Sequence, residues 1–479
     1  MSESEKKKVS RRAYVAGGAA VAAAAVAAGV GGYLYGQSQI PPVTTPPPTT
    51  PPVTTPPKTT PPPTTPPFTT LTYLGPVGPE PEVINDVAIP LYGSKHPEIL
   101  FTYDIAPREY HEEKLMREFT QKEGRYDIVW IWVAWQQKYG PTGGLEDLNK
   151  WITPSDAAYD PKVRDPILKG GYAWPKDKPQ RLLWPPVYWN TEVLFYRKDL
   201  FTDPKEKDDF EAEYGYELKP PETWDEWRDM MKFFYRPPDL YPLHVGTVGW
   251  NMGSFFFPLM YGTGAYVIDY DGNVDVTTDA FKKAFEFAVE QTKYCPPGWE
   301  TQSFFDGEHL FKEGKLAMHM CWEYYWPDLW VEGKTKIYGK GMWCAPPKPA
   351  GGRHACALSG GGLTLTTGSK HKRAAADFIQ FVDSFECQKA MALTGALGVH
   401  PGRLDVALDP DVVAVTHYIK ADYWDEFEAV ALPELYARAE PEIQDTWAQK
   451  VINVAKGTET VDSALADFKK KCEDVLKTL

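Results

Sequence analysis

A repetitive block of threonine and proline near the start of the chain limits where a folded domain can form. Residues 41–70 read PPVTTPPPTTPPVTTPPKTTPPPTTPPFTT, in which 14 prolines recur in a five-residue pattern. Proline lacks a backbone donor and fixes φ, so a segment this dense in proline can join neither a helix nor a sheet. Polyproline II is the conformation left to it, which makes the block an extended stalk. We therefore expect the folded part of the protein to begin after this block.

The residues before the stalk have the pattern of an export signal or a membrane anchor. Residues 14–35 are uncharged and rich in Ala and Gly. As a helix they would extend roughly 33 Å, enough to cross a bilayer. Basic residues precede them, which keeps that end cytoplasmic and directs the rest outside, and Ser10-Arg11-Arg12 fits a twin-arginine signal. We expect residues 1–36 to be the signal or anchor and residues 37–70 the stalk, with the folded part on the extracellular face of the cell membrane.

The length and charge of the chain after the stalk exclude several classes of function. Residues 71–479 are too many for one ordinary core, so two lobes or domains are expected. They carry 45 Lys and Arg against 63 Asp and Glu, a net charge of −18, which argues against nucleic acid and anionic lipid as partners. No Cys-x-x-Cys, His-Glu-x-x-His or other metal-ligand spacing occurs in the sequence, so we expect neither a metal nor another cofactor.

Six cysteines lie in the part of the chain that we expect outside the cell, where disulfides can form. Cys344 and Cys356 are the candidate pair, because the prolines and glycines between them predict a tight, turn-rich loop. Closing so short a loop would stabilise the fold by about 3 kcal/mol in the chain-entropy description. The alternative is that all six cysteines are free, buried thiols.

Hydrophobic patterns after the stalk predict an α/β fold. Apolar runs of strand length occur at 99–103 and 127–132, with a helical pattern between them that contains Leu115 and Phe119. A strand, a helix and a second strand in succession predict a parallel sheet with covered faces. Thr223 and Glu226 form a capping box that starts a helix. Further strands are predicted at 193–196, 315–322 and 362–366, and further helices around 280–288 and 375–382.

Six stretches of the chain share a resemblance to one family. They are YDIVWIWVAWQQKYGPTGGLEDLNKWI at 126–152, VLFYRKDLF at 193–201, PETWDEW at 221–227, FKEGKLAMHMCW at 311–322, GGLTLTTGSKHKRAAADFIQFV at 361–382 and VINVAKGTETVDSALADF at 451–468. In this order they resemble the extracellular solute-binding proteins of carbohydrate ABC transporters, the group that includes maltose-binding protein. The resemblance implies two α/β lobes of the periplasmic-binding-protein type, joined by crossover hinge strands, with a ligand cleft between them.

The resemblance also implies where the lobes lie and which partners the protein has. The first lobe would comprise residues 71–192 and 361–400, and the second 193–360 and 401–479. We expect a monomer that is attached to the membrane through its N-terminal segment and meets the permease subunits of an ABC transporter. The stalk fits such a protein, which must stay outside the cell and close to its permease.

A sugar offers apolar C–H faces and a rim of hydroxyls, so its site needs aromatic rings with polar groups at their edges. Open α/β sheets bind ligands at the ends of their strands, so residues of these types at the ends of predicted strands are the candidates. The resulting candidates are Trp132, Trp135, Trp189, Asn190, Trp250, Asn251, Trp322, Glu323, Gly361 and Tyr436. Each of the aromatic candidates could instead be a packed core residue, the reading that we adopt for Trp130 and Trp184. Family members often carry an aspartate where Trp132 stands, which implies a different substrate preference.

These features predict the substrate-binding component of an ABC transporter, which captures a sugar or oligosaccharide by hinge closure and catalyses no reaction. One alternative is the same fold with a non-sugar solute, such as a polyol or a peptide. Another is a secreted or stalked glycan-binding protein. A secreted glycosidase would need two carboxylates about 5–9.5 Å apart in a cleft, and no hydrolase motif is present in the sequence.

Overall fold

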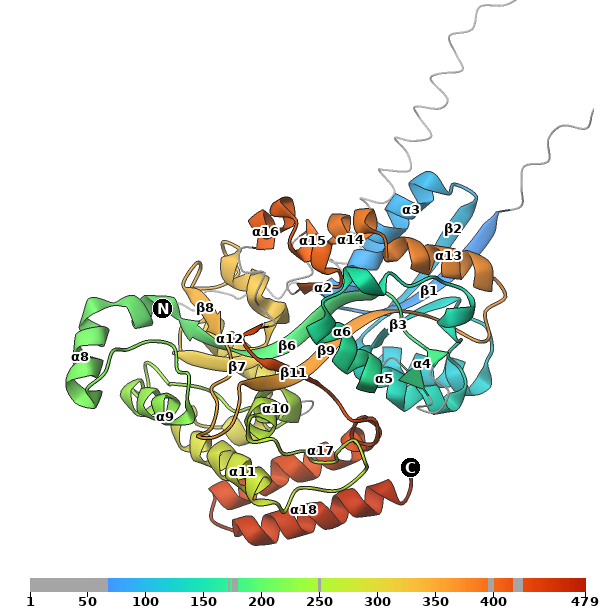
Figure 1. Ribbon diagram of the computed structural model, residues 1–479. Coiled ribbons are helices and arrows are strands. Elements are labelled where there is room, and N and C mark those ends of the chain that lie inside the picture. Colours follow the sequence, from blue (N-terminus) through green and yellow to red (C-terminus); the bar gives the residue numbers. More distant parts are fainter. Residues whose placement is uncertain (1–67, 171–172, 175–179, 249–250, 395–399, 417–424) are drawn as a thin grey trace, which may run out of the picture. The chain divides into compact units, whose positions relative to one another are not determined.

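The computed structural model describes residues 68–170, 173–174, 180–248, 251–394, 400–416 and 425–479 (Figure 1). The predicted signal, nearly all of the predicted stalk and Trp250 lie outside these residues. No helix within the described ranges is long and apolar enough to cross a membrane.

A mixed sheet of nine strands runs through the described part of the chain (Figure 1). Its main path has the order β10-β6-β9-β3-β1-β2, while β11 pairs with β9, and β7 and β8 pair with β6. The strands are β1 (Thr69–Pro76), β2 (Ile99–Ala106), β3 (Ile128–Trp132), β6 (Pro186–Arg197), β7 (Met318–Trp322), β8 (Gly341–Cys344), β9 (Ala355–Leu365), β10 (His400–Pro401) and β11 (Glu428–Ala431). A separate two-stranded sheet consists of β4 (Ala173–Trp174) and β5 (Gln180–Arg181).

Helices follow and cover these strands. They are α2 (Pro79–Val83), α3 (Ile89–Lys95), α4 (Arg108–Gln121), α5 (Val133–Tyr139), α6 (Pro161–Gly170), α7 (Lys198–Thr202), α8 (Pro204–Tyr214), α9 (Trp224–Phe233), α10 (Asn251–Thr263), α11 (Asp279–Gln291), α12 (Phe304–Lys312), α13 (Lys372–Val382), α14 (Phe385–Ala392), α15 (Leu404–Ala407), α16 (Pro410–Thr416), α17 (Glu434–Ala455) and α18 (Val461–Leu476). Short 3₁₀ segments complete the connections, among them η7 (Glu323–Trp330), which follows β7 directly.

The start of the fold confirms the predicted parallel sheet. β1 lies between β2 and β3 and is parallel to both, with Tyr73 opposite Tyr103 on one side and Ile128 on the other. The chain passes from β2 to β3 through α4, which packs against β1 and β2 and buries Leu115 and Phe119 completely. The predicted strands at 99–103 and 127–132 are therefore confirmed as β2 and β3.

β6 and β9 are the long strands of the sheet and hold it together. The first half of β6 pairs with β9 and β10, and its second half pairs with β7 and β8. The predicted strand at 193–196 is only the second half of β6. β9 runs antiparallel to both β3 and β6, so it joins strands that are far apart in the sequence.

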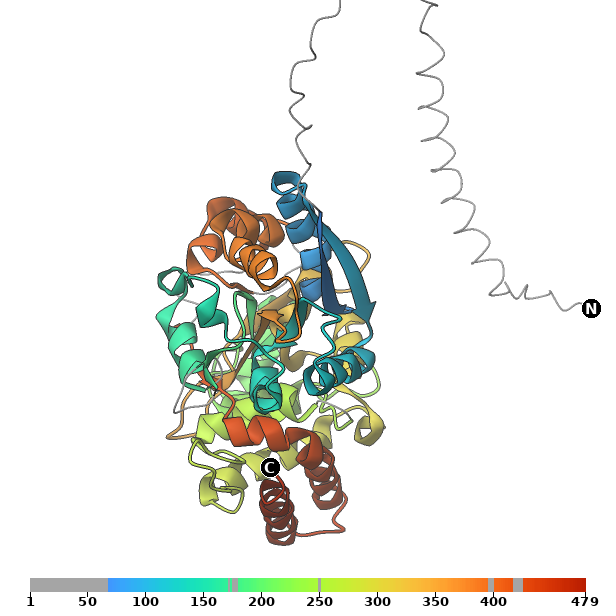
Figure 2. The same cartoon turned by 90° about the vertical axis from the view of Figure 1, so that its right-hand side faces the viewer.

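The helices after β6 enclose a second hydrophobic cluster. Thr223 and Glu226 form the predicted capping box at the start of α9. Four apolar side chains of this helix and its C-cap are completely buried: Trp227, Met230, Met231 and Phe234. α17 and α18 lie side by side in both views (Figure 1 and Figure 2). Trp447 of α17 packs between Phe256, Phe281, Phe285 and Phe468.

All six cysteines are free, so the predicted disulfide between Cys344 and Cys356 is wrong. Cys344 lies opposite Leu194 of β6, and its sulfur is 3.6 Å from the Leu194 carbonyl oxygen. The thiol of Cys356 instead contacts the hydroxyl of Thr191. Thr191 and Leu194 are three residues apart on β6, so their side chains point to opposite faces of the sheet. The two thiols therefore lie on opposite sides of the sheet.

Candidate functional site

Three parallel strands end at one edge of the sheet, and each leads directly into a helix. β1 is followed by α2, which carries Glu80 in its first turn, and β2 by α4, which starts at Arg108. β3 ends at Trp132, the residue before α5. Because the carboxyl ends of parallel neighbours meet at the same edge, the three side chains gather there, beside helix N-termini that carry partial positive charge.

Arg108 and two tryptophans form a compact cluster at this edge. The guanidinium carbon of Arg108 lies 4.6 Å from the ring centre of Trp132 and 5.6 Å from that of Trp135. The two indole rings are 4.6 Å apart and inclined at 66°. Trp135 is buried, whereas Trp132 is partly exposed. Cation–π contact holds the guanidinium over the rings, and Arg108 and Trp132 are the partly exposed members of the cluster that a ligand can reach.

The charged groups around this cluster have shifted proton affinities. Burial raises the pKa of Glu80 to about 7, and the nearby Arg108 opposes that rise. Burial lowers the pKa of His111 to about 4. His111 stacks on Trp135, and its Nε2 donates to the backbone oxygen of Trp130 at 3.0 Å. At neutral pH, His111 is thus a neutral hydrogen-bond donor and Arg108 is the permanent cation of the cluster.

Four of the predicted site residues lie on one face of the sheet. Gly361 of β9 is opposite both Trp132 of β3 and Tyr188 of β6. Asn190 follows Tyr188 by two residues on β6, and Glu192 follows Asn190 by two more. Trp322 of β7 is directly opposite Glu192. Residues directly opposite each other, and residues two apart on one strand, share a face. Trp132, Gly361, Asn190 and Trp322 therefore form a row on one face, across four neighbouring strands.

Two buried oxygens on this row have no hydrogen-bond partner in the described part of the protein. They are Oδ1 of Asn190 and Oε1 of Glu192. The other carboxylate oxygen of Glu192 accepts a hydrogen bond from the backbone N–H of Ala357 at 2.8 Å. Burial raises the pKa of Glu192 well above its usual range, and the neighbouring Glu323, itself buried, raises it further. The row therefore offers acceptor oxygens next to the partly exposed ring of Trp322.

The structure places the remaining predicted residues elsewhere or leaves them untested. Trp189 is adjacent to Asn190 on β6 and so points to the opposite face, where its indole N–H donates to the Gly402 carbonyl at 2.9 Å. Tyr436 is buried, and its hydroxyl lies 3.3 Å from a carboxylate oxygen of Glu440. Asn251 is the first residue of α10. Trp130 and Trp184 are buried, as predicted.

Gly361 makes room for a neighbouring side chain. A Cβ at this position would lie 2.4 Å from Cζ2 of Trp130. The indole of Trp130 thus lies across Gly361 and stacks on Tyr188, with ring centres 6.1 Å apart at 13°. The space on the Cβ side of Gly361 is filled by Trp130, so contact between this glycine and a ligand stays a prediction.

Sequence reasoning missed Glu80, Arg108 and Glu192. A signal for Glu192 was available, because it is the one charged residue within the otherwise uncharged run VYWNTEVLFY at 187–196. Glu80 and Arg108 follow strands but lie in charged segments, where nothing local separates them from surface residues. None of the three is aromatic, so the pattern expected for stacking on a sugar does not include them.

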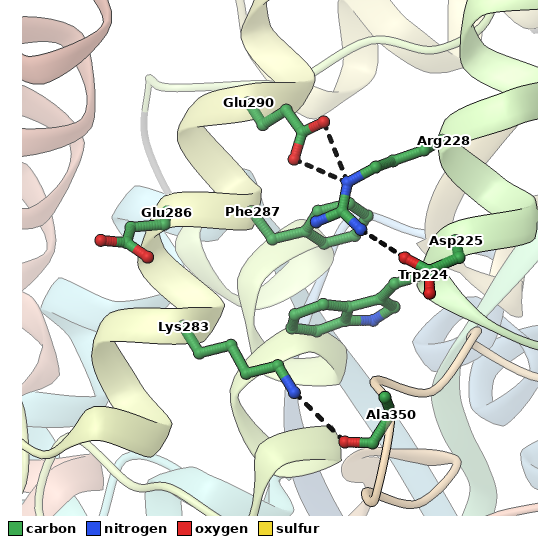
Figure 3. Close-up of a pocket in the computed structure, with 8 residues that line it drawn as sticks. All are labelled: Trp224, Asp225, Arg228, Lys283, Glu286, Phe287, Glu290 and Ala350. Atoms are coloured by element: carbon green, nitrogen blue, oxygen red, sulfur yellow. Dashed lines mark hydrogen bonds and ion pairs between the residues drawn. The ribbon is translucent and has the colours of Figure 1, made fainter.

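A pocket of about 230 Å³ lies between α9 and α11, away from this row (Figure 3). The rings of Trp224 and Phe287 stack there with centres 4.2 Å apart. Arg228 pairs with Glu290 at 2.9 Å and with Asp225 at 2.6 Å, and Lys283 donates to the Ala350 carbonyl. Arg228 and Lys283 already have partners, and the two rings stack on each other. We therefore interpret this pocket as part of the packing between α9 and α11, and not as a ligand site.

Residues 79–384 match the model of the bacterial extracellular solute-binding protein family, which covers more than half of the chain. The chain belongs to this family. A probable ABC transporter-binding protein of Deinococcus radiodurans is 24% identical to this solute-binding protein over 345 residues, 70% of this chain and 76% of the relative. The family and this relative identify the chain as an extracellular solute-binding protein of the ABC-transporter type.

Solved structures show the same fold. Maltose-bound MalE3 of T. maritima superposes with a TM-score of 0.67 and 23% identity, over 85% of this chain and 99% of MalE3. A solute-binding protein of Agrobacterium radiobacter K84 in complex with ribitol gives a TM-score of 0.68 and 20% identity, over 85% and 99% of the two chains. The predicted α/β fold of the two-lobe periplasmic-binding-protein type is thereby confirmed for this solute-binding protein.

Proposed function

We propose that this solute-binding protein captures a sugar or oligosaccharide on the row from Trp132 to Trp322 and delivers it to an ABC permease. The observation that carries the proposal is the pair of partly exposed indoles, Trp132 and Trp322, on one face of the sheet. Between them lie two unpartnered oxygens, Oδ1 of Asn190, which is an acceptor, and Oε1 of Glu192, which donates when the carboxyl is protonated and accepts when it is ionised. Aromatic faces suit the C–H surface of a sugar ring, and these polar oxygens suit its hydroxyls, which both donate and accept hydrogen bonds.

A similar structure that holds maltose supports a sugar ligand, and another that holds ribitol supports the polyol alternative. The ligand would bridge two lobes, made of residues 71–192 with 361–400 and of residues 193–360 with 401–479. Contacts that form only in the closed state would favour closure, and closure would mark the protein as loaded for the permease. No bond of the ligand changes in this cycle. The N-terminal segment and stalk would keep the protein at the membrane.

Ligand titration of the full-length protein tests the proposal. Intrinsic tryptophan fluorescence is followed with maltose, glucose, ribitol, mannitol, an amino acid and a dipeptide. We expect saturable changes with at least one sugar, unaltered ligand on recovery, and a more compact particle in small-angle scattering. If only a polyol gives saturable binding, the ligand class in the proposal changes from a sugar to a polyol. Binding of only the amino acid or the dipeptide would overturn the proposal.

A matched pair of variants tests whether the ligand binds on the row. Trp322→Ala removes a partly exposed indole from it, and we expect Kd to rise tenfold or more, which is about 1.4 kcal/mol. Trp299→Ala removes a partly exposed indole from the short helix at Trp299–Thr301, and we expect Kd to stay within twofold. Equal effects of the two substitutions would show that the ligand binds elsewhere.

A further inference from the structure

We propose that the sugar taken by this site carries a free amino group, held as an ammonium ion between Glu192 and the ring of Trp322. This inference rests on the proposed function and adds the substrate class. Glu192 of β6 and Trp322 of β7 are directly opposite in an antiparallel ladder, so their side chains share a face and are close. Glu323 follows Trp322 in the chain and is also buried.

Glu192 is a buried carboxyl group for which the described residues supply no counter-charge. It is fully buried, one of its oxygens accepts from the Ala357 N–H, and the other has no hydrogen-bond partner among them. Moving a carboxylate away from water is costly unless a cation accompanies it. A buried carboxyl without a cation therefore stays protonated in the empty protein, in line with its raised pKa. A ligand that brings an ammonium supplies the missing partner.

Asn190 is a second and independent sign of the same ligand chemistry. Its side chain is 7% exposed, and its Oδ1 has no partner within the described ranges. It lies two residues from Glu192 on the same face of β6. An ammonium group has three donors and no acceptor, so it can use Oε1 of Glu192 and Oδ1 of Asn190 together.

The ring of Trp322 completes the recognition of a cation. It is partly exposed, so a ligand can reach its face, and an indole is the best aromatic partner for an ammonium. At the other end of the row, Arg108 lies over Trp132 and beside Glu80. Because the permanent cation is at the Trp132 end and the extra carboxyls are at the Trp322 end, the amino group would be oriented toward β7.

Matched ligands measure this preference directly. The full-length protein is titrated at pH 7 with glucose, glucosamine and N-acetylglucosamine, with the corresponding disaccharides, and with ethanolamine as an amine without a sugar ring. We expect the free amino sugar to bind at least tenfold more tightly than both its hydroxyl and its N-acetyl analogues. We expect ethanolamine to bind more weakly than any of the sugars.

Two variants and a pH series test the role of Glu192 itself. Glu192→Gln should abolish the preference for the amino sugar, while Glu286→Gln, on the exposed side of α11, should keep it. Asn190→Asp adds a second carboxylate and should strengthen amino-sugar binding only. In the unmodified protein, the ratio of amino-sugar affinity to neutral-sugar affinity should fall as pH decreases, and taking this ratio cancels the effect of Glu80, whose pKa of about 7 acts on both ligands. This series tests the idea even if Glu192→Gln does not fold.

The outcomes separate this inference from the proposed function. Equal affinity for amino and neutral sugars would overturn the ammonium site and leave the sugar-binding function in place. Ethanolamine binding as tightly as the amino sugar would overturn the requirement for a sugar ring, and with it the proposed function. Binding of none of the sugars would overturn both proposals.

Discussion

Glu192 and Trp322 face each other as a directly opposed pair on β6 and β7. The neighbours of Glu192 on β6 include Val193, Leu194 and Phe195, all of them buried and apolar. A buried carboxyl in such a strand lowers the stability of the fold relative to an apolar side chain. A local departure from good packing of this kind is characteristic of functional positions.

Arg108 should be needed for ligand binding, because it holds the indoles of Trp132 and Trp135 in place. We expect Arg108→Ala to raise Kd about tenfold, equivalent to about 1.4 kcal/mol. Arg117→Ala, an exposed position on the same helix, should leave Kd within twofold. Isothermal titration of both variants measures the difference, and similar affinities would remove Arg108 from the site.

Gly361 should not tolerate alanine, because the added Cβ would lie 2.4 Å from the indole of Trp130. We expect Gly361→Ala to lower the free energy of unfolding by about 1–3 kcal/mol, the usual effect of overpacking. Gly93→Ala in α3 is the control, since no atom lies within 4 Å of its added Cβ, and it should be neutral or slightly stabilising. Denaturant unfolding measures the stability of both variants, and equal stabilities would contradict the packing role of Gly361.

Glu308 should make stability depend on pH. Burial raises its pKa to about 7, although the hydroxyl of Tyr324 donates to it. The ordinary value is 4.5, so between pH 4.5 and 7 the folded state binds more protons than the unfolded state. This group therefore stabilises the folded state at low pH. The stabilisation decreases as pH rises from 4.5 through 7, by up to about 1.4 kcal/mol per pH unit.

Glu308→Gln stays neutral and keeps an acceptor for Tyr324, so it should lose this dependence. The difference in unfolding free energy between the variant and the original protein should grow from pH 5 to pH 8. Comparing the two proteins cancels the opposite contribution of buried histidines such as His111. Glu286→Gln should follow the original protein at every pH. Parallel curves for Glu308→Gln would show that Glu308 titrates normally.

The cysteines should behave as six free thiols of low reactivity. Five of them are buried, and only Cys344 is partly exposed. We expect a thiol reagent to label at most Cys344 in the native protein and all six cysteines after unfolding without reductant. The Tm should be the same with and without reductant. Fewer than six reactive thiols after unfolding would indicate a disulfide.

The sequence predicted the elements that local patterns define. The apolar run at 127–132 became β3, and the capping box at Thr223 and Glu226 starts α9. Local patterns did not reveal that β9 lies between β3 and β6, because these pairings join residues more than 160 positions apart. The partners of a strand depend on the whole fold, and a short window of sequence does not contain that information.

The candidate site was predicted only in part, for a reason that strand geometry explains. Trp189 and Asn190 were both proposed as ligand contacts, although adjacent residues of a strand point to opposite faces. The structure places Asn190 with Glu192 and packs Trp189 against Gly402. Arg108 was missed because its position follows from where β2 ends, which is a property of the sheet.

β6 is buried on both faces by different sets of side chains, since Val193 and Phe195 belong to one hydrophobic cluster and Leu194 to the other. Because β6 contributes side chains to both hydrophobic clusters, neither cluster can unfold without disturbing the other. Heat should therefore unfold residues 68–479 in a single cooperative step, and a substitution that weakens either cluster should lower the same transition temperature.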